Sequence, residues 1–336
     1  MASLLCSLAA CFRRSLFAEL RTGYLLRRAQ SGCVCAVWHG LTGFVNKQAV
    51  FCCSAYPFMF TRSLQSADGT ALRVDGYPTE LADPKGVVVL IHGFAEHRRR
   101  YGHVAKHLNQ HGYHVLAGDL RGHGESGGDR GYIDRFGDYV DDVTAFIGEA
   151  QKAFPSGDTR PPILVGHSMG GLVCLEYVLS HPKAVRALAI TSPFFGIKIK
   201  VPGWKRSLGM AASVIHPRLK LPNQIDSYIL SHDKASCKAY AEDPLIFHTA
   251  TARWFTEILA IHGDIRRRAP QLGIPMLLLQ AGDDQLVDSQ AAQQVFDLLG
   301  GQDKTMKVYP GLFHEILNEV ERETVLRDLT DWLGTH

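Results

Sequence analysis

The sequence predicts an α/β protein with a mostly parallel, eight-stranded sheet and helices on both of its faces. Short runs of branched apolar residues recur through residues 57–336, as they do in parallel strands that are buried on both faces. Segments with apolar residues at helical spacing lie between most of these runs. With 336 residues, of which 46% are hydrophobic, the chain is long enough to bury the core of such a domain.

The expected strands begin at residue 58, and the first two are joined by a hairpin signal at Ala67-Asp68-Gly69. The strands are expected at 58–64, 70–76, 87–91, 113–117, 162–165, 186–190, 275–280 and 305–309. The helices are expected at 101–111, 138–154, 169–180, 289–299 and 319–333. About 85 residues separate the sixth strand from the seventh, which is too long for a simple crossover. We therefore expect a second subdomain or an insertion over the sheet at this point.

The N-terminal segment, residues 1–56, differs in composition from the rest of the chain. The first 62 residues carry seven lysines and arginines and one acid, and six of the eight cysteines lie within the first 53 residues. Three functional readings are a lipoprotein cleavage box at Leu8-Ala9-Ala10-Cys11, a weak membrane span at 29–46 and an organelle transit peptide. We favour a dispensable extension that is poorly ordered or mis-assigned, with a targeting role left open.

The remaining residues, 63–336, hold 29 bases and 32 acids, so they carry no basic footprint for nucleic acid. No CxxC pair occurs, and a core of this size needs no disulfides, so we expect a cytoplasmic protein. His103, His107 and His111 share one helix face, but no Glu completes a zinc-protease pattern. We expect neither a metal nor a cofactor.

Ser168 stands at the centre of a G-x-S-x-G motif, Gly166–Gly170, between an expected strand and an expected helix. Such a tight turn lifts the serine hydroxyl clear of the sheet, and the small residues around it relieve the crowding. The N–H of Met169 is free to bind an anion because it lies at the helix start. The turn after the strand 87–91 begins with His-Gly, so the Phe94 N–H is the expected second oxyanion donor.

A serine nucleophile needs a base, and the base needs an orienting acid. His314 follows the eighth expected strand, and Asp283, Asp284 and Asp288 follow the seventh. These groups therefore emerge at the same sheet edge as Ser168. Asp288 is placed to cap the next helix and Asp283 to serve the turn, and Asp284 is our choice for the acid.

Further motifs are spread over residues 62–333. They are HGxxEH at 92–97 with Arg100-Tyr101, DLRGHGESG at 119–127, GYID at 131–134, DYVDDV at 138–143, GHSMGG at 166–171, DPL at 243–245, LQAGDDQLVDS at 279–289 and YPGLFHE at 309–315. With these motifs the chain resembles the α/β-hydrolase superfamily, and within it the monoacylglycerol lipase and lysophospholipase-like branch with a serine aminopeptidase S33-type domain. In that family the catalytic Asp stands three residues before a Val or Cys, which selects Asp284 over Asp283. The resemblance also implies a domain over 57–336 with a cap inserted at about 194–265.

The expected cap has an unusual distribution of apolar and basic residues. No acid occurs between Glu176 and Asp226. The apolar residues are Ile197, Ile199, Val201, Trp204, Leu208, Met210, Val214, Ile215 and Leu219, and the bases are Lys198, Lys200, Lys205, Arg206, Arg218 and Lys220. An apolar face with basic flanks suits a lid resting on anionic lipid. A cap with a solvated basic face is the alternative.

The expected function is a cofactor-free serine hydrolase that cleaves carboxylic esters of single-chain lipids, either monoacylglycerols or lysophospholipids, through an acyl-enzyme. The alternatives are an acyltransferase with the same triad, an aminopeptidase, and a non-catalytic binding protein on the same fold. Product analysis with an alcohol acceptor separates the first alternative, and proline amides test the second. The expected partners are a small lipid ester and, through the cap, a membrane surface.

Overall fold

The computed structural model describes residues 26–28, 34–36, 59–154, 160–198, 203–223 and 225–336. The chain divides into two compact units, Met1–Tyr56 and Pro57–His336. In the first unit, β1 (Leu26–Arg28) pairs with β2 (Val34–Ala36) in antiparallel orientation. Nearly all of the segment for which we expected poor order or a targeting role lies outside the described residues.

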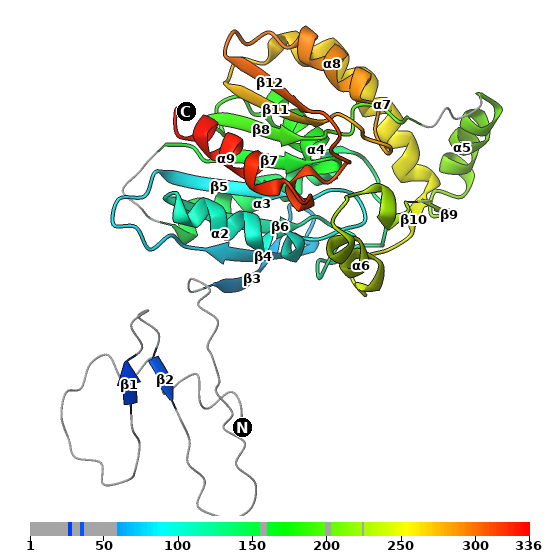
Figure 1. Cartoon of the computed structure of the whole chain (residues 1–336). Helices are drawn as coiled ribbons and strands as arrows, with labels where there is room; N and C mark the ends of the chain where they lie inside the picture. The colour runs from blue at the N-terminus through cyan, green and yellow to red at the C-terminus, as the bar shows by residue number, and fades with distance from the viewer. Residues whose placement is uncertain (1–25, 29–33, 37–58, 155–159, 199–202, 224) are drawn as a thin grey trace, which may run out of the picture. The chain divides into compact units, whose positions relative to one another are not determined.

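The second unit is built on an eight-stranded sheet. Its strands are β3 (Phe60–Gln65), β4 (Ala71–Tyr77), β5 (Gly86–Ile91), β6 (Tyr113–Asp119), β7 (Ile163–His167), β8 (Ala187–Thr191), β11 (Met276–Ala281) and β12 (Lys304–Tyr309). The spatial order is β12-β11-β8-β7-β5-β6-β4-β3 (Figure 1). The pairs β3–β4 and β4–β6 are antiparallel, and the other pairs are parallel. The expected mostly parallel sheet is therefore confirmed.

Helices cover both faces of the sheet, as expected. They are α2 (Gly102–Gln110), α3 (Gly137–Ala153), α4 (Met169–Ser180), α7 (Ala252–Arg268), α8 (Ser289–Leu298) and α9 (Arg322–Leu333). Side chains of α2 and α9 belong to the same core cluster as Val88 and Leu90 of β5, whereas side chains of α3, α4, α7 and α8 belong to the cluster that contains Val89 and Ile91. This alternation follows from the two-residue period of a strand. Within the described ranges, none of the helices combines the length and the apolar character needed to cross a bilayer.

Residues 192–275, which we call the inserted segment, connect β8 to β11. Before α7 this segment forms α5 (Gly203–Ile215), β9 (Lys220–Pro222), the 3-10 turn η2 (Ser227–Ile229), α6 (Lys234–Glu242) and β10 (Thr249–Thr251). β9 and β10 pair as a small antiparallel ribbon, and α5 packs against α7 (Figure 1). Ile258 and Ile265 of α7 join the main core, so this helix also belongs to the layer that covers the sheet.

The ribbon of the inserted segment is fixed to a loop of the sheet at Gly131. The carbonyl of Gly131 accepts hydrogen bonds from the N–H of Thr251 at 3.0 Å and from its hydroxyl at 2.8 Å. Gly131 has a φ of 68°, and a Cβ on it would lie 2.5 Å from the carbonyl oxygen of Thr249. A glycine is therefore required where the two backbones meet.

Candidate active site

Ser168 lies in the turn between β7 and α4 with φ 51° and ψ −116°, a backbone conformation that residues other than glycine rarely adopt. Backbone hydrogen bonds hold it there. Its N–H donates to the Thr191 carbonyl at 2.9 Å, and its carbonyl accepts from the N–H groups of Gly171 and Phe194 at 3.0 Å each. A strained residue persists where the surrounding structure over-determines it, as it does here.

The glycines of the motif allow the backbones around Ser168 to approach each other. A Cβ on Gly166 would lie 2.6 Å from the Gly170 carbonyl oxygen, and a Cβ on Gly170 would lie 2.3 Å from the Ile91 carbonyl oxygen. No side chain fits at either position without moving the backbone. The turn thus packs the start of α4 directly against the end of β5.

Asp284 and His314 meet at the ends of neighbouring strands, β11 and β12. The His314 Nδ1 atom lies 2.7 Å from Asp284 Oδ2, and both side chains are buried. The other carboxylate oxygen of Asp284 accepts from the N–H groups of Leu286 and Val287 at 2.9 Å each. These contacts fix the ring and leave its Nε2 atom on the side away from Asp284.

The contact with Asp284 changes the proton affinity of both groups. Burial alone would lower the pKa of His314, but the charge and hydrogen bond of Asp284, together with the charges of Glu315 and Glu96, raise that pKa above its usual value. Burial would raise the pKa of Asp284, but His314 and the two N–H donors hold it below its usual value. The carboxylate therefore stays ionised and stabilises the imidazolium form of the ring.

The other two acids of the segment have different contacts. The Asp288 carboxylate accepts from the Gln290 N–H at 2.9 Å and caps the start of α8. Asp283 donates its backbone N–H to the Leu312 carbonyl at 3.0 Å. Of the three, Asp284 is the one whose carboxylate contacts His314.

Two backbone N–H groups are available near Ser168. Met169 is the first residue of α4, where a helix N–H has no acceptor within the helix. Phe94 lies in the turn that follows β5, and the N–H of the preceding Gly93 is already bonded to Glu96 Oε1 at 2.6 Å. Phe94 and Ser168 line the same cavity.

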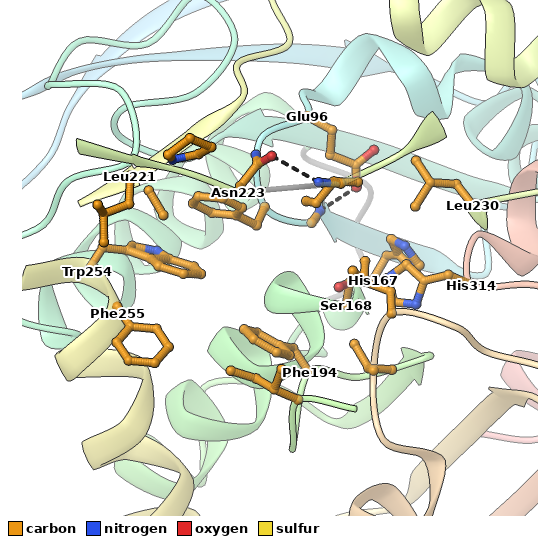
Figure 2. A pocket seen from close by; sticks show the side chains of 18 of the residues that line it. Glu96, His167, Ser168, Phe194, Leu221, Asn223, Leu230, Trp254, Phe255 and His314 are labelled. Atoms are coloured by element: carbon orange, nitrogen blue, oxygen red, sulfur yellow. Dashed lines mark hydrogen bonds between the residues drawn. The ribbon is translucent and has the colours of Figure 1, made fainter. Parts of the chain in front are cut away.

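This cavity has a volume of about 350 Å³ and lies between the sheet edge and the inserted segment. Figure 2 shows Ser168, His167, His314 and Glu96 at one end of it. The remaining wall is mostly apolar and includes Phe194, Ile197, Leu221, Ile225, Leu230, Trp254, Phe255 and Leu286. Its shape and lining suit a ligand with one polar end and an apolar body.

The sequence motifs contain His167 and Glu96 but predict no role for either residue. Both line the polar end of the cavity. His167 Nδ1 lies 2.9 Å from the Thr191 hydroxyl, and its ring centroid is 4.9 Å from that of His314. Burial, helped by the nearby His314, lowers the pKa of His167 to about 4, so this ring is neutral at pH 7. Burial opposes ionisation of Glu96, but Arg100 and other neighbours lower its pKa to about 2.

Within the part of the chain that the structure describes, no three His, Cys, Asp or Glu side chains are grouped to hold a metal ion. The histidines of the α2 region have other contacts. His103 Nε2 lies 2.7 Å from the Leu317 carbonyl oxygen, and His107 Nε2 lies 3.1 Å from the Thr330 hydroxyl.

Comparisons with known proteins agree with this architecture. The model of the family described as serine aminopeptidase S33 matches residues 82–321. A monoacylglycerol lipase from Mycolicibacterium smegmatis is 33% identical over 255 residues, which cover 76% of this chain and 90% of that protein. Phospholipase YtpA from Bacillus subtilis is 34% identical over 250 residues, covering 73% and 93%. The crystal structure of the Paleococcus ferrophilus monoacylglycerol lipase superposes with a TM-score of 0.72 at 29% identity, covering 79% and 99%. The chain therefore belongs to the serine aminopeptidase S33 family of the α/β-hydrolase superfamily.

Proposed function

We propose that the protein is a serine hydrolase that cleaves carboxylic esters of single-chain lipids, either monoacylglycerols or lysophospholipids. The observation that carries this proposal is the position of Ser168 at the polar end of an apolar cavity that His314 also lines. A single acyl chain fits such a lining because its burial is favourable at roughly 25 cal/mol per Å² of apolar surface. The relative named monoacylglycerol lipase supports the first of these substrate classes, and the relative named phospholipase supports the cleavage of a phospholipid ester.

In the first half of the reaction, Ser168 Oγ attacks the ester carbonyl and His314 Nε2 takes the hydroxyl proton. The negative charge that develops on the carbonyl oxygen is held by the N–H groups of Phe94 and Met169. The tetrahedral intermediate then collapses: the bond to the alcohol breaks, and His314 returns the proton to the leaving oxygen. Asp284 stabilises the imidazolium throughout this half-reaction.

In the second half, water replaces the alcohol in the cavity. His314 takes a proton from this water, and its oxygen attacks the acyl carbonyl on Ser168. The same two N–H groups hold the second oxyanion. Collapse of that intermediate releases the fatty acid, and the proton goes back to Ser168 Oγ.

We further propose that the inserted segment, including the expected cap at 194–265, contacts a lipid surface. Among its described side chains, the large exposed hydrophobic ones are Met210, Val214, Ile215, Leu219 and Leu221, which lie on α5, β9 and the turn between them, and Tyr228 of η2. Leu221 also lines the cavity, so the exposed apolar surface is continuous with the cavity wall. An acyl chain that leaves a bilayer at this surface reaches Ser168 without crossing water, which supports the proposal.

The basic residues of this surface have different contacts. Lys198 Nζ donates a hydrogen bond to the Asp284 carbonyl oxygen at 2.5 Å, so this base contacts the loop that carries Asp284. Arg218 pairs with Asp129 at 2.9 Å. Lys220, whose side chain is described, is exposed and lies between the exposed Leu219 and Leu221 in the chain. Part of the lipid-facing surface expected from the sequence lies outside the described residues. This part comprises Ile199, Lys200 and Val201 and the side chains of Trp204, Lys205, Arg206 and Leu208.

Ser168→Ala tests the proposed function. We expect hydrolysis of monoacylglycerol and of a short soluble ester to fall by several orders of magnitude, as in other triad knock-outs. Labelling by a fluorophosphonate probe should disappear, while the thermal unfolding temperature stays close to that of the wild type. Labelling that persists on another serine would contradict the assignment of Ser168.

A substrate panel separates the remaining activities. It contains a monoacylglycerol, a lysophospholipid, a proline amide, and a monoacylglycerol with an added alcohol acceptor. The proposal expects free fatty acid from the first two substrates. Preferred cleavage of the amide would indicate an aminopeptidase, and transfer of the acyl group to the alcohol in preference to water would indicate an acyltransferase.

A further inference from the structure

A buried carboxylate controls the turn that carries the Phe94 amide. Glu96 Oε1 accepts from the Gly93 N–H and from the Tyr101 hydroxyl, each at 2.6 Å. A Cβ on Gly93 would lie 2.7 Å from Glu96 Oε1, so the glycine makes room for this carboxylate. The turn is tight, since Ala95 has a φ of 66°. Glu96 therefore fixes the His92–Gly93 peptide, which is one unit before the peptide that carries the Phe94 N–H.

A second carboxylate belongs to the loop that carries His314. Glu315 follows His314 directly and binds Arg100 through both oxygens, with Nη1–Oε1 at 2.7 Å and Nη2–Oε2 at 2.6 Å. The same Nη1 atom of Arg100 lies 2.6 Å from Glu96 Oε2. Asn318 Nδ2 donates to Glu315 Oε2 at 2.9 Å, and the Glu315 N–H donates to the Leu230 carbonyl at 2.8 Å. Arg100 thus bridges the two loops.

The bridge is buried. Glu96 and Glu315 are both buried, the Arg100 side chain is 10% exposed, and its guanidinium lies 4.8 Å from the centre of the Tyr240 ring. Removing charges from water in this way is unfavourable, and buried charges are tolerated when they are paired and hydrogen-bonded. A planar guanidinium can bind both carboxylates in a fixed geometry, which a lysine ammonium cannot do.

The sheet does not by itself set the spacing of these two loops. Phe94 follows β5 and His314 follows β12, and β7, β8 and β11 lie between those strands. Small differences in the twist of the intervening strands add up, and their sum shifts the loop after β12 relative to the loop after β5. A direct link between the loops removes this freedom.

We propose that Arg100 is a positioning residue for the reaction proposed above. By binding Glu96 and Glu315 together, it holds the Phe94 amide and the His314 ring at the separation that the tetrahedral intermediate requires. An error of about 1 Å in such a separation costs on the order of 100-fold in rate. This inference rests on the proposed function, since it assigns Phe94 and His314 their roles in ester hydrolysis.

Arg98 provides a matched control in the same 3-10 turn, η1 (Arg98–Tyr101). Its buried guanidinium forms ion pairs with Asp75 of β4 and Asp119 of β6, neither of which belongs to the two loops. Arg98→Lys and Arg100→Lys therefore make the same chemical change in neighbouring buried networks. Only the second variant weakens the link between Phe94 and His314.

The experiment compares these two variants with the wild type on a short-chain p-nitrophenyl ester that needs no lipid surface. For Arg100→Lys we expect kcat to fall on the order of 10- to 100-fold with KM nearly unchanged, because acylation and deacylation both use the two loops. For Arg98→Lys we expect a lower unfolding temperature and a kcat per folded molecule that stays close to that of the wild type.

Glu315→Gln adds a readout that a purely structural role would not change. His314 faces Asp284, Glu315, Glu96 and the neutral His167; burial lowers its pKa, and the three carboxylates raise it. Glu315→Gln should lower kcat and also move the acid limb of the pH–rate profile to lower pH. Arg100→Lys keeps its charge, so its acid limb should stay close to that of the wild type.

Three results overturn the inference: an Arg100→Lys variant with unchanged kcat, one that changes only KM, or equal losses of kcat in Arg98→Lys and Arg100→Lys. If Arg100→Lys does not fold, Glu315→Gln decides, and an unchanged kcat there overturns the inference as well. A wild type that cleaves no ester overturns the proposed function, and this inference with it. An active wild type with an equally active Arg100→Lys overturns this inference alone.

Discussion

At the His314 ring, one buried carboxylate orients the base and contributes the most, among three nearby carboxylates, to its affinity for a proton. Asp284 is the stronger candidate for that carboxylate because its Oδ2 atom contacts Nδ1, while Asp288 caps a helix. The acid limb of the activity profile reports the loss of the His314 proton in the free enzyme. Because the pKa of His314 is raised, we expect this limb above pH 6.5 in the wild type.

Asp284→Asn should lower kcat on the order of 10⁴-fold and move the acid limb to lower pH, because the variant no longer stabilises the imidazolium or the correct tautomer. The measurement is kcat/KM of a soluble ester between pH 5 and pH 9. Asp288→Asn is the control, with a loss of about 1 kcal/mol in unfolding free energy from its helix cap and little change in rate. A dead Asp283→Asn beside an active Asp284→Asn would reassign the acid.

The close packing around Gly166 and Gly170 leads to a separate prediction about the free energy of unfolding. Gly170→Ala should lower the unfolding free energy by about 1–3 kcal/mol, because its Cβ would overlap the Ile91 carbonyl oxygen. Gly148→Ala in α3 is the matched control: nothing lies within 4 Å of its Cβ, and alanine favours the helix by up to about 1 kcal/mol. Urea unfolding of both variants checks the two opposite signs. Equal stability of Gly170→Ala and the wild type would contradict the packing argument.

Among the elements, strands were predicted more fully than the helices of the inserted segment. All eight strands of the sheet lie within two residues of their expected limits. The central strands β5, β6, β7, β8 and β11 are buried on both faces, and such strands appear as continuous apolar runs, whereas the edge strands β3 and β12 are largely exposed. No limits were predicted for α5, α6 or α7. Val214 and Ile215 show why: they are apolar, yet 79% and 78% exposed, so an apolar pattern in α5 does not identify a buried face.

The double variant Val214→Ser/Ile215→Ser tests whether α5 contacts lipid. We expect weaker binding to anionic vesicles and lower activity on vesicle-borne monoacylglycerol, with unchanged activity on a short soluble ester, because the cavity wall is left intact. Val320→Ser, which removes a 61% exposed apolar side chain outside the inserted segment, is the control. Equal losses on soluble and vesicle-borne substrates would mean that α5 shapes the cavity without binding lipid.

Lys220 makes a related prediction about charge. Lys220→Glu should weaken binding to anionic vesicles by roughly 1–2 kcal/mol, since each basic charge at such a surface contributes about 1 kcal/mol. The loss should shrink as salt is raised, because exposed charges are screened within about 10 Å at 0.1 M. Co-sedimentation with vesicles at low and high salt measures it. A loss that is independent of salt would indicate a local structural change in β9.

Across the whole molecule, the predictable part of the site is the part that strand ends bring together. Ser168, Asp284 and His314 could be proposed from the sequence because each follows a strand and stands in a motif of fixed order. Arg100 and Glu315 are 215 positions apart in the sequence. Their contact depends on the distance between the loop after β5 and the loop after β12, which are not neighbouring strands. Motif spacing carries no information about that distance.

Stability against acid also depends on contacts across the molecule. His262 of α7 lies 2.7 Å, through Nε2, from the carbonyl oxygen of Phe194 at the start of the inserted segment. Burial lowers the pKa of His262 to about 4, whereas an unfolded histidine titrates near 6.5. Between pH 4 and pH 6.5, His262 is protonated in the unfolded chain and neutral in the folded protein. Stability from this residue is therefore fully present above pH 6.5 and is lost as the pH falls toward 4.

His262→Gln removes this titration and keeps an N–H donor for the Phe194 carbonyl. At pH 7.5 the variant should be less stable than the wild type, because the amide does not fill the same buried space. Between pH 7.5 and pH 5.5 the wild type should lose about 1 kcal/mol more than the variant, so the gap between them narrows by that amount. Carboxylates titrate alike in both proteins and cancel in the comparison. Urea unfolding at the two pH values measures the difference, and a gap of constant size would show that His262 accepts its proton in the folded state.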